Sequence, residues 1–409
     1  MNRVSEPGRL MFVWVLTRVL LPGVMLGSGY YKIVFADLGT YQRWAVEAFA
    51  GQPPGVTTDW AYPVGSLAPI VVPRVFGGGT DRYALLFVVL ACAVDVAALV
   101  LLARRGRTSG GGLRGAWWWV VFGGLAGPVL LTRLDLPSAL PALASLSAGP
   151  FAAGALLATG TAMKGWPVFL LPAVLAGRDI RGWWQVVCGA GAVLGAIGAL
   201  LVLTGNTGHV FSFAGFQSGR LPEVESVGAL PRLWTSAVGA GNTVVFGDHT
   251  QSYEVLGAGR WPAVALGLSM AVAVAVSVAG LLAARSPEQR ELAVTATATG
   301  LACCALIGDK VFSAQYVVWL AVPVAWSACR PGRVRRIELA VLGIALATQV
   351  VFPFGWARLV YGGTWPLIVM TFRDILVVGC LGASCLTLVR LLTGPAAARA
   401  LAGGPAGAT

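Results

Sequence analysis

A carboxylate, two aromatic side chains and a cation stand close together just after the first long apolar run of the chain. Asp37 is followed by Tyr41, Arg43 and Trp44, where a hydrophobic helix is expected to leave the membrane. A carboxylate can deprotonate an acceptor hydroxyl, and aromatic faces can hold sugar rings. Asp37 is therefore a candidate catalytic base. The alternative is that Asp37 caps a short helix at the membrane surface.

Ionisable residues also occur at the other junctions that are predicted to face the same side of the membrane. They are Arg133 and Asp135, Lys164, Arg220 with Glu223 and Glu225, Asp309 with Lys310, and Arg358. An ionisable group at membrane depth is costly, which makes each one a candidate functional residue. A single such charge can also reach the headgroup level by snorkelling. Because these junctions share one face, we expect them to form a common polar cavity.

The sequence gives little support for other kinds of chemistry. It has two histidines, and no His/Cys/Asp cluster has metal-ligand spacing, so we predict no metal site. The seven cysteines lie in or beside apolar runs and are expected to be small buried residues. No glycine loop typical of nucleotide binding and no nucleophile elbow is present. Carboxylates, cations and aromatic rings remain, and they suit the transfer of a sugar from a phosphate leaving group.

The elements that must position these residues are membrane helices. The chain has 409 residues, of which 57% are hydrophobic and 11% charged, whereas soluble proteins carry about 25% charged residues. We predict an all-α polytopic membrane protein with about 12 spanning helices, within a range of roughly 10–13. The apolar runs behind this prediction are 10–31, 84–103, 116–132, 136–148, 151–163, 166–177, 184–203, 261–283, 290–307, 311–328, 337–353 and 367–391.

The loops between these runs predict the orientation. Arginine-rich loops alternate with loops that hold most of the acidic residues, and the basic set is expected to be cytoplasmic. Both termini would then be cytoplasmic in a multi-pass protein of the cell (inner) membrane, with the site facing outside. The net charge of +12 fits basic cytoplasmic loops and contact with anionic lipid, not nucleic acid. Residues 1–392 are expected to form one domain with long extracytoplasmic loops at 33–82 and 204–260, and 393–409 a disordered cytoplasmic tail.

Four stretches of the chain resemble one glycosyltransferase family. Residues 310–320, KVFSAQYVVWL, resemble its pattern Lys-Val-(Leu/Phe)-Ser-Pro-Gln-Tyr-Leu-Leu-Trp-Leu, with Ala314 in place of proline. Residues 220–226, RLPEVES, resemble its Arg-Gly-Leu-Gln-(Ile/Val)-Glu-Ser pattern. Residues 132–172 keep the Arg-x-Asp and Lys-x-Trp-Pro elements. In the stretch beginning at residue 30, the family's Glu-Tyr-Pro-Pro is replaced by AYPV at 61–64.

The family is glycosyltransferase family 87, the polyprenyl-phosphate-mannose-dependent mannosyltransferases with the GT-C fold. The resemblance implies that Asp37 is the general base of an inverting displacement. It also implies that cations match the charge of the lipid phosphate, the candidates being Arg220, Lys310, Lys164 and Arg133. Sugar hydroxyls would be oriented by Glu225, Gln315 and Tyr316, for which ordinary helix–helix hydrogen bonding is the alternative. The candidate walls of the acceptor site are Tyr41, Trp44 and Tyr62.

The sequence therefore predicts a membrane glycosyltransferase that moves mannose, or a related sugar, from a polyprenyl-phosphate donor to a hydroxyl of a glycolipid or polysaccharide acceptor. Its partners would be donor, acceptor and membrane lipids; no cofactor is expected, because the lipid-linked sugar is a substrate, and the oligomeric state is left open. One alternative is a secondary transporter or a lipid or glycan flippase, which the broken helices between 136 and 177 would suit. Another is a non-catalytic assembly protein.

Overall fold

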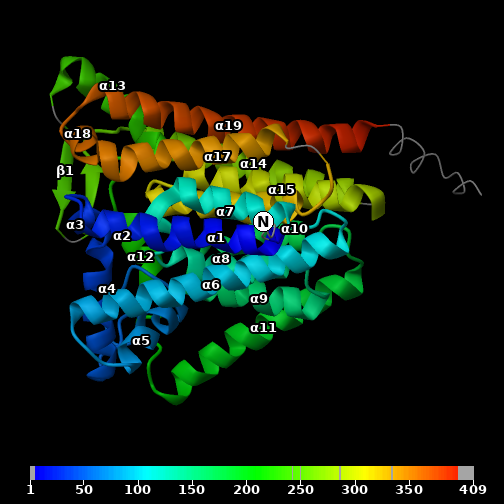
Figure 1. Cartoon of the computed structure of the whole chain (residues 1–409), viewed down its shortest axis with the longest axis horizontal. Helices are drawn as coiled ribbons and strands as arrows, with labels where there is room; N and C mark the ends of the chain where they lie inside the picture. The colour runs from blue at the N-terminus through cyan, green and yellow to red at the C-terminus, as the bar shows by residue number, and fades with distance from the viewer. Residues whose placement is uncertain (1–4, 242, 249, 285–286, 333–334, 395–409) are drawn as a thin grey trace, which may run out of the picture.

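The computed structural model is mostly helical and describes residues 5–241, 243–248, 250–284, 287–332 and 335–394. Most long helices run roughly along the long axis of the molecule (Figure 1). A strand and several short helices lie together at one end, on the left of the view. Of the predicted tail, residues 395–409 lie outside the described residues.

The first half of the chain contributes the N-terminal helices and the helices that pack beside them. Their bounds are α1 Glu6–Val15, α2 Leu21–Leu26, α3 Tyr31–Val34, α4 Ala36–Phe49, α5 Leu67–Val75, α6 Thr80–Thr108, α7 Arg114–Ala126, α8 Asp135–Ser145, α9 Pro150–Met163, α10 Leu171–Leu175 and α11 Ile180–Leu203.

The second half contains the remaining helices and both strands. Their bounds are α12 Ser212–Gly219, α13 Leu230–Thr235, β1 Val244–Gly247, β2 Ser252–Val255, α14 Trp261–Ala283, α15 Pro287–Gly308, α16 Val317–Ala328, α17 Arg336–Gln349, α18 Trp356–Val360 and α19 Thr364–Thr393. Short 3₁₀ and π-helical turns join several of them, at 16–20, 64–66, 127–130, 166–170, 227–229, 236–240, 314–316 and 350–355.

The helices are those of a membrane-embedded protein. Seven helices in the described part of the chain are long and apolar enough to cross a membrane: Glu6–Leu26, Thr80–Thr108, Ile180–Leu203, Trp261–Ala283, Gln289–Gly308, Arg336–Val360 and Thr364–Thr393. Four shorter apolar helices add Val64–Val75, Pro150–Met163, Trp166–Leu175 and Ala314–Ala328. The prediction of a helical membrane protein is confirmed, whereas the predicted number of 12 spans is not established.

The predicted loop at 204–260 contains an antiparallel hairpin that the sequence analysis did not anticipate. In this hairpin β1 pairs with β2, with Val244 opposite Val255. The backbone N–H of Val224 donates to the Tyr253 carbonyl at 3.0 Å, and the N–H of Val255 donates to the Pro222 carbonyl at 2.8 Å. These bonds attach the hairpin to the segment 220–226, which therefore has a fixed position.

A buried ion pair fastens the first helix to the bundle. Arg18 Nε lies 2.9 Å from Asp95 Oδ2, and neither side chain is more than 1% exposed. The indole N–H groups of Trp14 and Trp119 also donate to this carboxylate, at 2.7 and 2.6 Å. Asp95 therefore joins three segments of the chain, through Trp14 and Arg18 on the first and Trp119 on α7.

Small residues allow α9 and α11 to pack closely. A Cβ on Gly154 would lie 1.9 Å from the Val186 carbonyl oxygen, and a Cβ on Gly189 would lie 1.9 Å from that of Phe151. Glycine at these two positions lets the backbones approach, as at other small-residue interfaces between membrane helices. In Figure 1, α11 forms the outer edge of the molecule opposite α19.

Candidate active site

One large cavity brings together residues from five distant segments of the chain. Its volume is about 1600 Å³. It is lined by the eleven residues to which the sequence assigned a role: Asp37, Tyr41, Trp44, Tyr62, Arg133, Lys164, Arg220, Glu225, Lys310, Gln315 and Tyr316. Of the other ionisable residues expected there, Glu223 and Asp309 line the cavity, whereas Asp135 and Arg358 do not. The cavity makes a shared site geometrically feasible, while the role of each residue stays a prediction.

Asp37 lies in the first turn of α4 and is held by an arginine from a distant segment. Arg133 Nε lies 2.9 Å from Asp37 Oδ2. Arg133 is itself fixed, because its Nη1 donates to the carbonyls of Val34 and Thr132 at 2.9 and 3.2 Å. The Asp37 side chain is 39% exposed, and its other oxygen has no hydrogen bond among the described residues. The N-cap residue of α4 is Phe35, and no side chain forms a capping hydrogen bond there. The alternative interpretation, in which Asp37 caps this helix, is therefore wrong.

Lys164 is buried between aromatic rings and a carboxylate. Its Nζ lies 2.6 Å from Asp135 Oδ2, and the other Asp135 oxygen accepts from the indole of Trp319 at 2.9 Å. The ammonium also lies 4.6 Å from the ring centre of Tyr316 and 5.5 Å from that of Tyr62. Burial disfavours the charged ammonium, but Asp135, Tyr62 and Asp37 together outweigh this effect and raise the pKa of Lys164.

Arg220 is tied to the hairpin and to a buried glutamate. Its Nη2 donates to Glu223 Oε1 at 2.5 Å and to Ser252 Oγ at 2.7 Å. The second Glu223 oxygen accepts from Ser313 at 2.8 Å. Burial raises the pKa of Glu223 even though Arg220 is adjacent. The Nε of Arg220 is buried and makes no hydrogen bond, although Glu254 Oε1 lies 3.9 Å from it.

Lys310 adjoins Arg220 and is held by carbonyl groups. Its Nζ donates to the carbonyls of Ser218 and Arg220, each at 2.7 Å. The salt bridges of the described residues include none for this ammonium. Burial, and then the charge of Arg220, lower the pKa of Lys310. Lys310 and Arg220 together form a cationic corner, in which Arg220 is paired with Glu223 and Glu254 while Lys310 has no ion pair among the described residues.

The aromatic residues form one wall of the cavity. Trp44 stacks on Tyr41 with ring centres 5.8 Å apart, and meets Trp60 and Tyr62 edge to face at 5.3 and 5.8 Å. Tyr41 is only 2% exposed and packs against Phe87. Trp44 and Tyr62 are half-buried and offer more surface to a bound molecule than Tyr41 does.

Glu225 has a buried ion-pair partner, Arg373 on α19. Its Oε1 lies 3.0 Å from Arg373 Nη1, and Arg373 also lies 2.9 Å from Asp374. Arg373 therefore links α19 to the segment that holds Glu225. Burial raises the pKa of Glu225 to about 7. Gln315 is half-buried and has no hydrogen bond within the described part of the chain.

The same cavity has an apolar arm that no pattern in the sequence indicated. It is lined by α14 and α15 through Leu266, Met270, Ala273 and Leu301. Leu266 is 48% exposed and Met270 61% exposed, so the arm reaches the outer surface of the helices. No sequence signal could have found it, because apolar residues in an apolar helix are unremarkable without their neighbours.

The comparisons with known proteins return nothing: no family model matches the chain, and no curated protein or solved structure is similar to it.

Proposed function

We propose that the protein is a GT-C-type glycosyltransferase of the cell membrane, which transfers mannose or a related sugar from a polyprenyl phosphate to a glycolipid or polysaccharide hydroxyl. The observation that carries the proposal is the common cavity, which holds a partly exposed carboxylate, a cationic corner and an aromatic wall. Sugar transfer from a lipid phosphate requires a base, charge compensation for the leaving group and a surface for sugar rings.

The ion pairs favour two of the four candidate cations as phosphate ligands. Arg133 is paired with Asp37 at 2.9 Å, and Lys164 with Asp135 at 2.6 Å. Either cation would have to give up or share its carboxylate partner in order to bind phosphate. Lys310 donates to carbonyls and has no carboxylate partner among the described residues. Arg220 is paired with Glu223 at 2.5 Å, but its Nε makes no hydrogen bond and it lies beside Lys310. We therefore assign the donor phosphate to Lys310 and Arg220. Arg133 and Lys164 are then positioning residues, the first for Asp37.

The apolar arm supports a lipid-linked donor. The cavity extends from the polar groups to Leu266 and Met270 on the outside of α14. A polyprenyl chain needs such an apolar route from the phosphate to the membrane interior, since its burial in a polar site would forfeit the hydrophobic contribution. A soluble nucleotide-sugar has no lipid chain to occupy this apolar arm.

The proposed reaction is a single displacement. The free Oδ1 of Asp37 accepts the proton of the acceptor hydroxyl, and the hydroxyl oxygen forms a bond to the anomeric carbon. The bond from that carbon to the phosphate oxygen breaks, and the lipid phosphate leaves with the electron pair. Lys310 and Arg220 stabilise the negative charge that develops on it. Attack opposite the phosphate inverts the anomeric configuration.

The basic loops at the opposite ends of the helices support an orientation with this cavity outside and both termini inside the cell. A transporter would need a route between the two faces. All residues of α16, from Val317 to Ala328, are buried, and this helix fills the space between the cavity and the other face. Packed protein at this position favours an enzyme with a one-sided site.

The test is transfer by purified protein of radiolabelled sugar from a polyprenyl phosphate to membrane lipid extract. Wild type should form labelled product, and Asp37→Asn should lower turnover by at least about 100-fold while donor binding is retained. Asp81→Asn is the matched control, because Asp81 is an exposed carboxylate outside the cavity. Near-wild-type turnover by Asp37→Asn would exclude this base.

A further inference from the structure

A second cavity lies at the far end of the helices that line the large one. Its volume is about 500 Å³. Glu291, near the start of α15, lines this cavity, whereas Gly308, at the end of the same helix, lines the large one. A helix rises about 1.5 Å per residue, so the two positions lie roughly 25 Å apart along its axis. The proposed transferase reaction uses none of the residues at this end.

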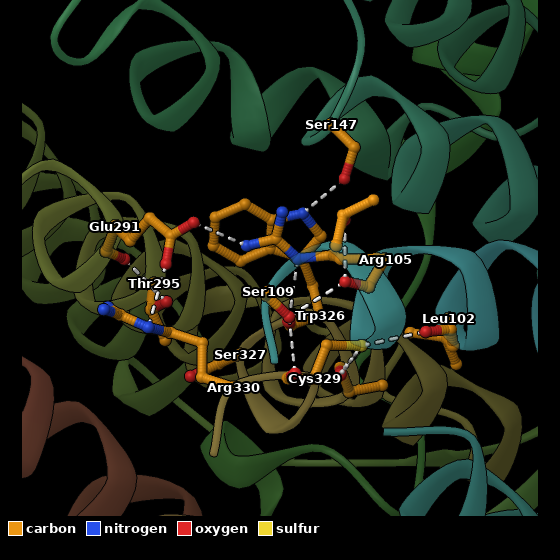
Figure 2. Close-up of polar contacts among 12 residues, drawn as sticks. Leu102, Arg105, Ser109, Ser147, Glu291, Thr295, Trp326, Ser327, Cys329 and Arg330 are labelled. Carbon is orange, nitrogen blue, oxygen red and sulfur yellow. Dashed lines mark hydrogen bonds and ion pairs between the residues drawn. The ribbon is translucent and has the colours of Figure 1, made fainter. Parts of the chain in front are cut away.

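The wall of this cavity carries an excess of positive charge. Its described lining includes four arginines and one acidic residue, which are Arg105, Arg178, Arg290, Arg330 and Glu291. Glu291 is already shared, since Oε1 lies 3.0 Å from Arg105 Nη2 and Oε2 lies 3.0 Å from Arg330 Nε. Figure 2 shows the glutamate between these two guanidinium groups. No carboxylate oxygen of Glu291 is left for the other two arginines.

Arg178 and Arg290 supply the uncompensated charge. Arg178 donates only to backbone carbonyls, those of Val174 at 2.7 Å and Ala148 at 3.0 Å. Arg290 has no hydrogen bond or ion pair among the described residues, and its side chain lies against Gly177, where a Cβ would come within 2.7 Å of its Cδ. Burial, and then the neighbouring Arg290 charge, lower the pKa of Arg178. Two like charges held together in this way favour an anion between them.

The rest of the cavity is apolar and rigid. Leu146, Ala173, Val174 and Val294 are each at most 9% exposed. Trp326 lies beneath the guanidinium of Arg105, with 3.6 Å between its ring centre and Cζ, and its indole donates to Ser147 at 2.8 Å. Figure 2 shows this stack and the hydrogen bond that fixes the ring. A basic rim above an apolar floor suits an amphiphile with a phosphate head.

We propose that this cavity binds a phosphate group, and that Arg178 and Arg290 are its ligands. Arginine pairs with phosphate through several charge-assisted hydrogen bonds. Basic pockets between membrane helices on the cytoplasmic side bind the headgroups of anionic lipids, which makes phospholipid the nearest source of the phosphate. A soluble phosphate compound offers the same chemistry. The inference does not depend on the proposed transferase activity.

Two binding measurements on the purified full chain distinguish these sources. Native mass spectrometry compares the binding of phosphatidylglycerol with that of phosphatidylcholine, and equilibrium dialysis measures the binding of radiolabelled orthophosphate. We expect preferential binding of phosphatidylglycerol. Binding of orthophosphate alone would support the phosphate site with a soluble ligand. Absence of both overturns the proposal.

Three variants make the assignment specific. Arg290→Gln should weaken binding about ten-fold, which corresponds to roughly 1.4 kcal/mol, and should fold normally because its side chain has no described hydrogen bond. Arg104→Gln removes one positive charge from an exposed residue of α6 that is the neighbour of Arg105 but does not line the cavity. This control should change binding less than two-fold. Glu291→Gln should tighten binding, because it releases Arg105 and Arg330. Equal losses in Arg290→Gln and Arg104→Gln, or weaker binding in Glu291→Gln, overturn the assignment.

Discussion

Arg133 holds Asp37 by an ion pair of 2.9 Å in the wall of the large cavity. The two residues are almost a hundred positions apart, and the arginine is anchored independently by the carbonyl of Val34 at 2.9 Å. The pair directs one carboxylate oxygen toward Arg133 and leaves the other unpaired. In the proposed reaction, this arrangement fixes the direction from which the acceptor is deprotonated.

The first prediction concerns this positioning. Arg133→Gln should lower kcat by about 10- to 100-fold with little change in the donor KM, because a misplaced base slows proton transfer without affecting phosphate binding. Arg133→Lys should recover part of the loss, since it keeps the charge without the fork geometry. Steady-state kinetics with varied donor measures both. A rise in donor KM with kcat unchanged would contradict this positioning role and would indicate that Arg133 binds the donor phosphate.

The second prediction concerns the cationic corner. Lys310→Gln should reduce kcat/KM for the donor by about 100-fold, because a cation that stabilises the leaving phosphate acts in the transition state. The matched control is Lys32→Gln, an exposed lysine outside the cavity. Inhibition by free polyprenyl phosphate should weaken in parallel for Lys310→Gln alone. Equal inhibition of both variants and wild type would show that Lys310 does not contact the phosphate.

The third prediction is a pH dependence of stability from Glu225. Burial raises the pKa of Glu225 to about 7 in the folded protein from its ordinary 4.5. The folded state therefore binds more protons than the unfolded state between these values, and stability falls as pH rises through this window, by at most about 1.36 kcal/mol per pH unit. The apparent melting temperature in detergent should decline from pH 5 to pH 7. Glu225→Gln should flatten this decline, whereas Asp81→Asn should retain it.

The fourth prediction concerns the buried pair of Arg18 and Asp95. Asp95→Asn leaves a guanidinium with 1% exposure without its counter-charge, and removing one partner of a buried pair costs about 3–5 kcal/mol. The apparent melting temperature should drop clearly, while the donor KM of the folded fraction should not change. A thermal scan of Asp95→Asn beside Asp81→Asn checks this. Similar midpoints for the two variants would contradict a structural role.

The sequence by itself determined that this is a helical membrane protein and where its polar junctions lie. Long apolar runs must become helices in a membrane, because no water is present to satisfy an open backbone. The ionisable residues between those runs, such as Asp37, Lys164 and Arg220, were therefore identifiable as candidates one by one. The apolar pattern of each segment, taken alone, could not identify the ion-pair partners of these residues. It also could not establish the number of membrane-spanning helices.

Tertiary structure alone decided how the charges pair. Arg133 and Lys164 were equivalent to Lys310 as candidate phosphate ligands until packing placed carboxylates 2.9 and 2.6 Å from them. In the sequence, the arginines at 105, 178, 290 and 330 indicated only which loops are cytoplasmic. The tertiary structure brings these four side chains together around one cavity. Both outcomes depend on contacts between segments far apart in the chain. An ion pair is set by the distance and burial of its members in space, which the spacing of residues along one segment does not encode.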